Sequence, residues 1–142
     1  MPGRILVVED DAMNAKLFQL ILARKAGFQV EVTEDPKLVL ERARAGQVDV
    51  IIMDVSLSNS EWDGTPVDGL EISRRLKRDP EAGRIPILLA TAHAMKGSRE
   101  NFLRASGADD YISKPIVSAD DLVARIEALI AKRNHALPPP AR

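Results

Sequence analysis

The chain of 142 residues contains no cysteine, which excludes disulfides and thiolate metal sites and fits a reducing compartment. Its net charge of -1 gives no reason to expect nucleic acid or an anionic membrane surface as a partner. No apolar run approaches the ~20 residues of a membrane span, and the N-terminal apolar segment reaches Glu9 too early for a signal peptide. We therefore expect one compact cytoplasmic domain.

Five short apolar segments alternate with segments of helical periodicity. The apolar segments predict strands at residues 5–8, 28–32, 49–54, 85–90 and 110–113. The first helix has a predicted inner face of Leu17, Phe18, Leu20 and Ile21. Right-handed crossovers between such strands give an α/β fold, a doubly wound parallel sheet of five strands with five helices.

Polar side chains stand where these strands end. Glu9 and Asp10 follow the first strand, Asp54 ends the third, Thr91 follows the fourth and Lys114 follows the fifth. Parallel strands bring these ends to one edge of the sheet. The three carboxylates would repel each other there unless a divalent cation and a lysine offset their charge. Oxygen ligands without histidine or cysteine favour Mg²⁺ or Mn²⁺.

Such a site suits phosphoryl transfer. A carboxylate, here Asp54, can attack phosphorus to form an acyl phosphate. A cation and Lys114 would offset charge on the transferring oxygens, and Thr91 would donate a hydrogen bond to the new phosphoryl group. Each of these residues also has a simpler interpretation. The acidic run after the first strand could cap a helix, Thr91 could be an ordinary strand residue, and Lys114 could be a surface lysine. For Asp11 we prefer capping.

Taken in order, four motifs resemble the receiver domains of two-component response regulators, over residues 4–133. These motifs are Glu9-Asp10, Met53-Asp54-Val55, Thr91-Ala92 and Ser113-Lys114-Pro115. The resemblance implies a flavodoxin-like strand order, 2-1-3-4-5, and a cis bond between Lys114 and Pro115.

The resemblance also assigns roles to residues of the site. Asp54 would be the phosphoacceptor, and it would bind the metal together with Asp10 and the backbone carbonyl of Ser56. Glu9 would bind the metal mostly through water. Thr91 and Tyr111 would form the conformational switch. Ser56 and His93 would tune the kinetics, although His93 also fits a solvated loop residue.

A narrower resemblance is to stand-alone cell-cycle receivers of the DivK type. It is based on Ala94-Met95-Lys96-Gly97 together with two residues of the first helix, Asn14 and Phe18. The candidate residues of a partner surface are Asn14, Phe18, Trp62, Met95 and Ile116.

The sequence departs from the receiver pattern after Asp54. Gly69, expected to open the third helix, follows Asp54 by fifteen residues rather than about eight, and the usual proline soon after Asp54 is missing. We expect a receiver domain over residues 1–133 with an extended loop at 58–68, then a disordered proline-rich tail at 134–142. Trp62 in this loop would pack locally, contact a partner or cover the site.

The favoured function is a single-domain response regulator that takes a phosphoryl group from a histidine kinase or phosphotransfer protein. A downstream protein effector would then recognise its changed surface, with no nucleic acid or membrane involved, and the chain would be a monomer or weak homodimer. It would not be an enzyme beyond assisting its own phosphorylation and dephosphorylation. One alternative is a haloacid-dehalogenase-like phosphatase, but Ser56 stands where that class has a second aspartate. The other is a pseudo-receiver scaffold.

Overall fold

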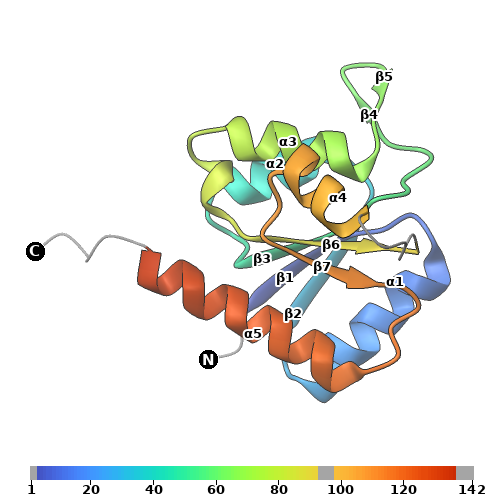
Figure 1. The fold of residues 1–142 in the computed structure, drawn as a ribbon, viewed down its shortest axis with the longest axis vertical. Coiled ribbons are helices and arrows are strands. Elements are labelled where there is room, and N and C mark those ends of the chain that lie inside the picture. The colour runs from blue at the N-terminus through green and yellow to red at the C-terminus, as the bar shows by residue number, and fades with distance from the viewer. Residues whose placement is uncertain (1–2, 93–97, 137–142) are drawn as a thin grey trace, which may run out of the picture.

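A five-stranded parallel sheet forms the centre of the molecule (Figure 1). The computed structural model describes residues 3–92 and 98–136. The strand order is β2-β1-β3-β6-β7, which is 2-1-3-4-5 when only the strands of this sheet are numbered. The predicted class and strand order are therefore confirmed.

The strands of the sheet match the apolar segments of the sequence. They are β1 (Arg4–Val8), β2 (Gln29–Thr33), β3 (Val50–Asp54), β6 (Ile87–Thr91) and β7 (Asp110–Ser113). β3 and β6 are buried along their whole length, because helices cover both faces of a sheet of this kind. β3 lies between β1 and β6 and places Asp54 beside Ala90.

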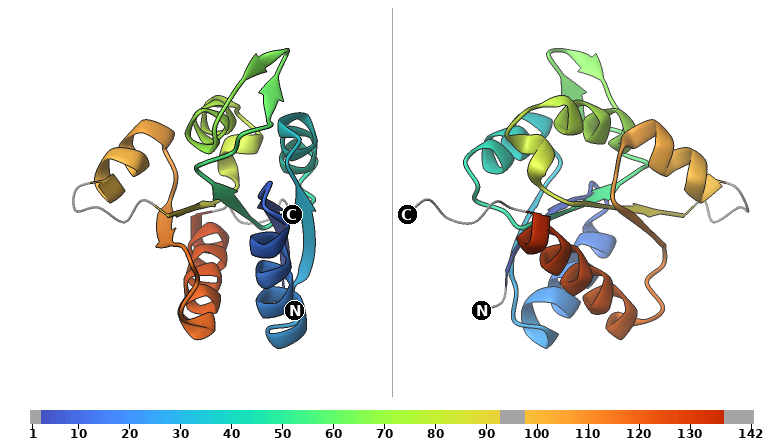
Figure 2. Two further views of the ribbon diagram at one scale, coloured as in Figure 1. Left: turned by 90° about the vertical axis from the view of Figure 1, so that its right-hand side faces the viewer. Right: turned by 60° about the vertical axis from the view of Figure 1, so that its left-hand side comes forward.

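Helices cover both faces of the sheet (Figure 2). They are α1 (Ala12–Gln19), α2 (Pro36–Arg44), α3 (Gly69–Arg78), α4 (Ser98–Ser106) and α5 (Ala119–Ala136). α1 and α5 pack on one face, where Phe18 and Ile126 meet Ile52 of the sheet. α2, α3 and α4 pack on the other, where Val39, Ile72 and Leu76 meet Met53.

The inner face of the first helix differs from the predicted one. Phe18, Ile21 and Leu22 are buried, whereas Leu20 is 44% exposed. The buried residues follow the spacing i, i+3, i+4, which places them on one stripe and turns Leu20 away from it. α1 continues into the π-helical segment η1 (Leu20–Lys25), where the amide of Ala26 donates to the carbonyl of Ile21.

Three helices begin at an aspartate whose side chain accepts a hydrogen bond from the first turn. Asp11 accepts from the amide of Asn14, Asp35 from that of Lys37 and Asp68 from that of Glu71. Each bond satisfies an amide that has no partner within its helix. The capping role expected for Asp11 is confirmed.

The segment after β3, predicted only as an extended loop, folds into a hairpin. β4 (Glu61–Trp62) and β5 (Thr65–Pro66) pair antiparallel and project from the body of the molecule (Figure 1). Asp63 and Gly64 form the turn, with φ of 52° and 81°. Positive φ at both positions is typical of the two-residue turns whose twist matches a hairpin.

The remaining elements complete the chain. The short helix η2 (Ala82–Arg84) precedes β6. α5 ends at Ala136, three residues into the segment predicted as a tail. Within residues 3–92 and 98–136, no helix is long and apolar enough to cross a membrane.

Candidate functional site

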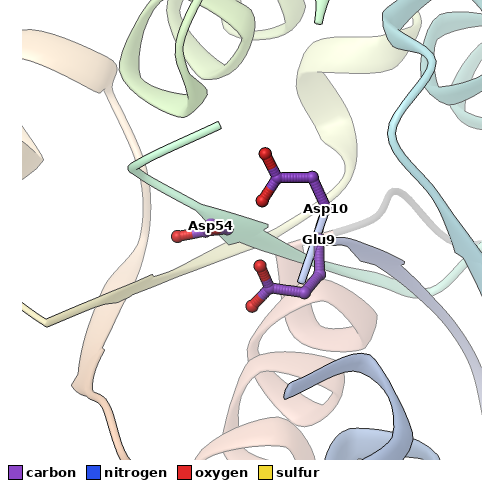
Figure 3. A group of neighbouring side chains, drawn as sticks. All are labelled: Glu9, Asp10 and Asp54. Atoms are coloured by element: carbon purple, nitrogen blue, oxygen red, sulfur yellow. The ribbon is translucent and has the colours of Figure 1, made fainter. Parts of the chain in front are cut away.

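The ends of β1 and β3 bring three carboxylates together. One carboxylate oxygen from each of Glu9, Asp10 and Asp54 lies within 4.8 Å of the others (Figure 3). Glu9 and Asp54 are each 3% exposed, and Asp10 is half-buried. The predicted gathering of acids therefore takes place, and it follows from the parallel pairing of β1 with β3.

Lys114 supplies the one ammonium that contacts this cluster in the described part of the chain. Its Nζ lies 3.0 Å from Asp54 Oδ1 and 3.1 Å from Glu9 Oε1. β7 ends at Ser113, and the amide of Lys114 donates to the carbonyl of Thr91, which fixes the start of the side chain. The bond to Pro115 is cis, as the resemblance implied.

The charges of the cluster do not balance. Three carboxylates and one ammonium leave two negative charges in a largely buried space when all are ionised. Burial, together with the neighbouring Asp54, raises the pKa of Glu9 from 4.5 to about 7 despite the opposing effect of Lys114. Burial works against the charge on Lys114, but hydrogen bonds to Asp54 and Glu9 outweigh it and raise the Lys114 pKa.

Asp10 is held by Ser58, a residue that belongs to none of the sequence motifs. The amide and the hydroxyl of Ser58 both donate to Asp10 Oδ2, each at 2.8 Å. These bonds outweigh partial burial and lower the pKa of Asp10. The missing proline after Asp54 was the one signal in the sequence that pointed here, because proline has no amide N–H to donate.

Backbone geometry fixes Asp54 from two sides. Its Oδ1 accepts a hydrogen bond from the amide of Ser56 at 3.1 Å, and Ser56 itself is exposed. At the start of α3, a Cβ added to Gly69 would lie 1.9 Å from the carbonyl oxygen of Asp54. Only glycine allows the first turn of α3 to approach the end of β3 this closely.

Thr91 and Tyr111 occupy the places expected of them in the sheet. Thr91 is fully buried at the end of β6, in register with Ser113 of β7. Tyr111 is buried in β7, and its ring stacks on Phe102 of α4 with the ring centres 6.4 Å apart. Arg125 of α5 donates to the Tyr111 carbonyl, so α4, β7 and α5 are in contact around this residue.

The predicted partner surface is only partly supported by exposure. Phe18 is 1% exposed and packs in the core, so its place on a surface is wrong. Asn14, Trp62 and Ile116 are half-buried. Trp62 packs against the core on the α2–α3 side and lies under the guanidinium of Arg75, which favours local packing among the three interpretations. His93 and Met95 lie outside the described residues.

The donor set of this site fits a hard divalent cation. All three acidic groups offer oxygen, two of them are buried, and the excess negative charge is the kind that such an ion offsets. A carboxylate held at 3.0 Å from an ammonium is also suited to attack an electrophile whose negative charge the ammonium can stabilise.

Comparisons with known proteins agree with this geometry. A family model described as the response regulator receiver domain matches residues 5–127. The chain is 38% identical over 116 residues to the polar-differentiation response regulator DivK of Brucella anthropi, a match that spans 82% of this chain and 87% of that protein. It is 37% identical over 124 residues to hybrid signal transduction histidine kinase I of Dictyostelium discoideum, which spans 82% of this chain and 7% of that protein.

Solved structures give the same result for the fold. The receiver domain of sensor histidine kinase PA1611 from Pseudomonas aeruginosa, with a magnesium ion coordinated in its active-site cleft, superimposes with a TM-score of 0.75 at 28% identity. That match covers 92% of this chain and 99% of the other. The receiver domain of Francisella response regulator 1452 superimposes with a TM-score of 0.74 at 23% identity, covering 92% and 98% of the two chains.

Proposed function

This chain belongs to the response regulator receiver domains, and from that premise we propose that it accepts a phosphoryl group on Asp54 from a histidine kinase or a histidine phosphotransfer protein. The observation that supports this most is the position of Lys114. Its ammonium contacts Asp54 and Glu9 within one buried acidic cluster at the carboxyl edge of the sheet.

The reaction transfers one phosphoryl group and forms an acyl phosphate. An oxygen of Asp54 attacks phosphorus, and the bond between phosphorus and the donor atom breaks with its electron pair staying on the donor. Lys114 offsets the negative charge that accumulates on the phosphoryl oxygens. In the product, the hydroxyl of Thr91, at the end of β6, donates a hydrogen bond to one of those oxygens.

The metal that this site would hold is Mg²⁺, with Mn²⁺ as a substitute. Asp10, Asp54 and the carbonyl of Ser56 would hold it directly, and Glu9 would hold it through water. When bound, the ion offsets charge on the transferring oxygens. The all-oxygen donor set supports this assignment, as does the magnesium ion in the similar PA1611 receiver domain.

Phosphorylation changes the surface around α4, β7 and α5. Thr91 and Tyr111 form the switch, and the stacking of Tyr111 on Phe102 connects the switch to α4.

A downstream protein binds the changed surface in the cytoplasm, with no nucleic acid or membrane needed, and the chain works as a monomer or weak homodimer. Ser56 and His93 adjust the lifetime of the acyl phosphate. Outside its own phosphorylation and dephosphorylation the chain has no enzymatic role.

One experiment separates this function from phosphate-ester hydrolysis and from a fixed scaffold. The protein is incubated with Mg²⁺ and either beryllofluoride or a small phosphodonor, while intact mass and Trp62 fluorescence are recorded. We expect a slowly decaying adduct of one phosphoryl group in the parent protein and none in Asp54→Asn. Asp63→Asn, in the exposed hairpin turn, is the matched control and should form the adduct.

The other outcomes would each overturn the proposal. Repeated turnover of phosphate esters would indicate a phosphatase. Binding of Mg²⁺ without any adduct would indicate a scaffold. An adduct that persists in Asp54→Asn would move the acceptor to another residue.

A further inference from the structure

Ser58 joins the loop after β3 to the acidic cluster. Its amide and its hydroxyl each donate to the same oxygen of Asp10, Oδ2, at 2.8 Å. The two residues are 48 positions apart in the sequence, so the bonds depend on the path that the loop takes. Ser58 itself is exposed and lies outside the three carboxylates and Lys114.

The loop around Ser58 is fastened to the core. Leu57 and Val67, at its two ends, are buried in the core cluster on the α2–α3 side. Ser60 is 3% exposed, and its hydroxyl donates to the carbonyl of Glu34 at 2.7 Å while its own carbonyl accepts from the amide of Val67. Ser58 therefore donates to Asp10 from a segment with a fixed position.

The hairpin that follows is also anchored to neighbouring helices. The Nζ of Lys37 in α2 lies 2.9 Å from Oδ1 of Asp63 in the turn. The guanidinium of Arg75 in α3 stacks over Trp62, with its Cζ 5.1 Å from the ring centre. The segment between β3 and α3 is thus held at several points, and Ser58 is the residue of this segment that donates hydrogen bonds to Asp10.

The two bonds define the orientation of the Asp10 carboxylate. A carboxylate has two oxygens with about four lone-pair sites in total. With two donors on Oδ2, that oxygen is saturated and Oδ1 is left for a cation. A half-buried aspartate without such partners would rotate about its side-chain bonds, and this freedom would be lost when the ion binds.

We propose that Ser58 is a positioning residue for the cation site, which holds Asp10 in the orientation that binds Mg²⁺. This inference rests on the proposed function, because it takes Asp10 to be a metal ligand. It goes beyond that function by placing part of the metal affinity in the loop after β3. Hydrogen bonds to a ligating carboxylate typically account for about 10- to 100-fold in metal affinity.

The test is calorimetric titration of the full chain with Mg²⁺ alone, without any phosphodonor. Ser58→Ala removes the hydroxyl and retains the amide, so we expect the affinity to fall by about tenfold, the lower end of that range. Ser58→Thr retains both donors and should bind as the parent does. Asn59→Ala, which changes the exposed polar residue next to Ser58, is the matched control and should also bind as the parent does.

The outcomes distinguish this inference from the proposed function. If the parent binds Mg²⁺ and Asp10→Asn does not, the metal site stands. If Ser58→Ala then bound Mg²⁺ with the same affinity as Asn59→Ala, only the role of Ser58 would be overturned. Tighter Mg²⁺ binding by Ser58→Ala would overturn it as well, because Ser58 would then be competing with the ion for Asp10. The role of Ser58 would also be overturned if Ser58→Thr, which retains both donors, bound Mg²⁺ as weakly as Ser58→Ala. If the parent binds no Mg²⁺, the metal site and this inference both fail.

Discussion

Glu9 is the residue whose charge is most altered by its surroundings in the acidic site. Burial and the neighbouring Asp54 raise its pKa from 4.5 to about 7. The folded chain therefore holds a proton on Glu9 more tightly than the unfolded chain does. The stability this provides is complete below about pH 4.5 and is lost as the pH rises through about 7.

Replacement of Glu9 by Gln removes this loss. We compare the free energies of unfolding of Glu9→Gln and the parent in EDTA. The difference, variant minus parent, should be roughly 2 kcal/mol larger at about pH 8 than at about pH 5, because only the parent loses stability over this range. Urea unfolding at the two pH values measures the difference. Glu34→Gln, at an exposed carboxylate, should show no such change. A difference for Glu9→Gln that is independent of pH would mean that its pKa is not raised in the folded protein.

At the scale of elements, the contact between the start of α3 and the end of β3 determines the backbone around Asp54. A Cβ at Gly69 would lie 1.9 Å from the Asp54 carbonyl oxygen and 3.0 Å from Val55 Cα, so one of these backbones must shift. The site and the helix that follows the hairpin are therefore mechanically connected.

Gly69→Ala should accordingly lower the free energy of unfolding by about 1–3 kcal/mol, the usual cost of forcing extra atoms into a packed site. Urea unfolding measures this loss. We also expect weaker Mg²⁺ binding, measured by calorimetry, because the shift moves Asp54. Gly64→Ala, where an added Cβ meets nothing within 4 Å but φ is 81°, is the control for backbone strain alone and should leave Mg²⁺ affinity unchanged. Equal Mg²⁺ affinity in Gly69→Ala would show that this contact does not position Asp54.

The elements differ in how far the sequence predicted them. Strands buried on both faces must be apolar throughout, so β3 and β6 were visible as short apolar runs. The hairpin was missed although Asp63-Gly64 is a strong turn signal, because its strands have only two residues each and show no alternation. Phe18 fitted both an inner helix face and a partner surface, and only the packing shows that it is buried.

At the scale of the whole molecule, the sequence predicted those parts of the acidic site that the strand topology determines. Parallel strands in the order 2-1-3-4-5 bring Glu9, Asp10, Asp54 and Lys114 to one edge whatever the loops do. The bonds from Ser58 to Asp10 depend on the path of one loop, for which the sequence has no periodicity to read. The raised pKa of Glu9 likewise depends on burial that only the assembled fold determines.

Mg²⁺ should stabilise the molecule as a whole, since the ligands are brought together only by folding. At a concentration of about 100 times the dissociation constant, the ion should add about 2.7 kcal/mol to the free energy of unfolding. Urea unfolding with Mg²⁺ and with EDTA measures the gain. Asp10→Asn should lose most of it, whereas Asp11→Asn should retain it, because asparagine also caps a helix. A similar gain in both variants would exclude Asp10 as a ligand.

The central claim is that Asp54 accepts the phosphoryl group, and chemical mapping tests it most directly. The protein is incubated with Mg²⁺ and a small phosphodonor, treated with borohydride to reduce any acyl phosphate to an alcohol, and digested for mass spectrometry. We predict homoserine in place of Asp54 and unchanged aspartate at Asp10 and Asp63. Reduction at another carboxylate, or none at all in protein that binds Mg²⁺, would contradict the claim.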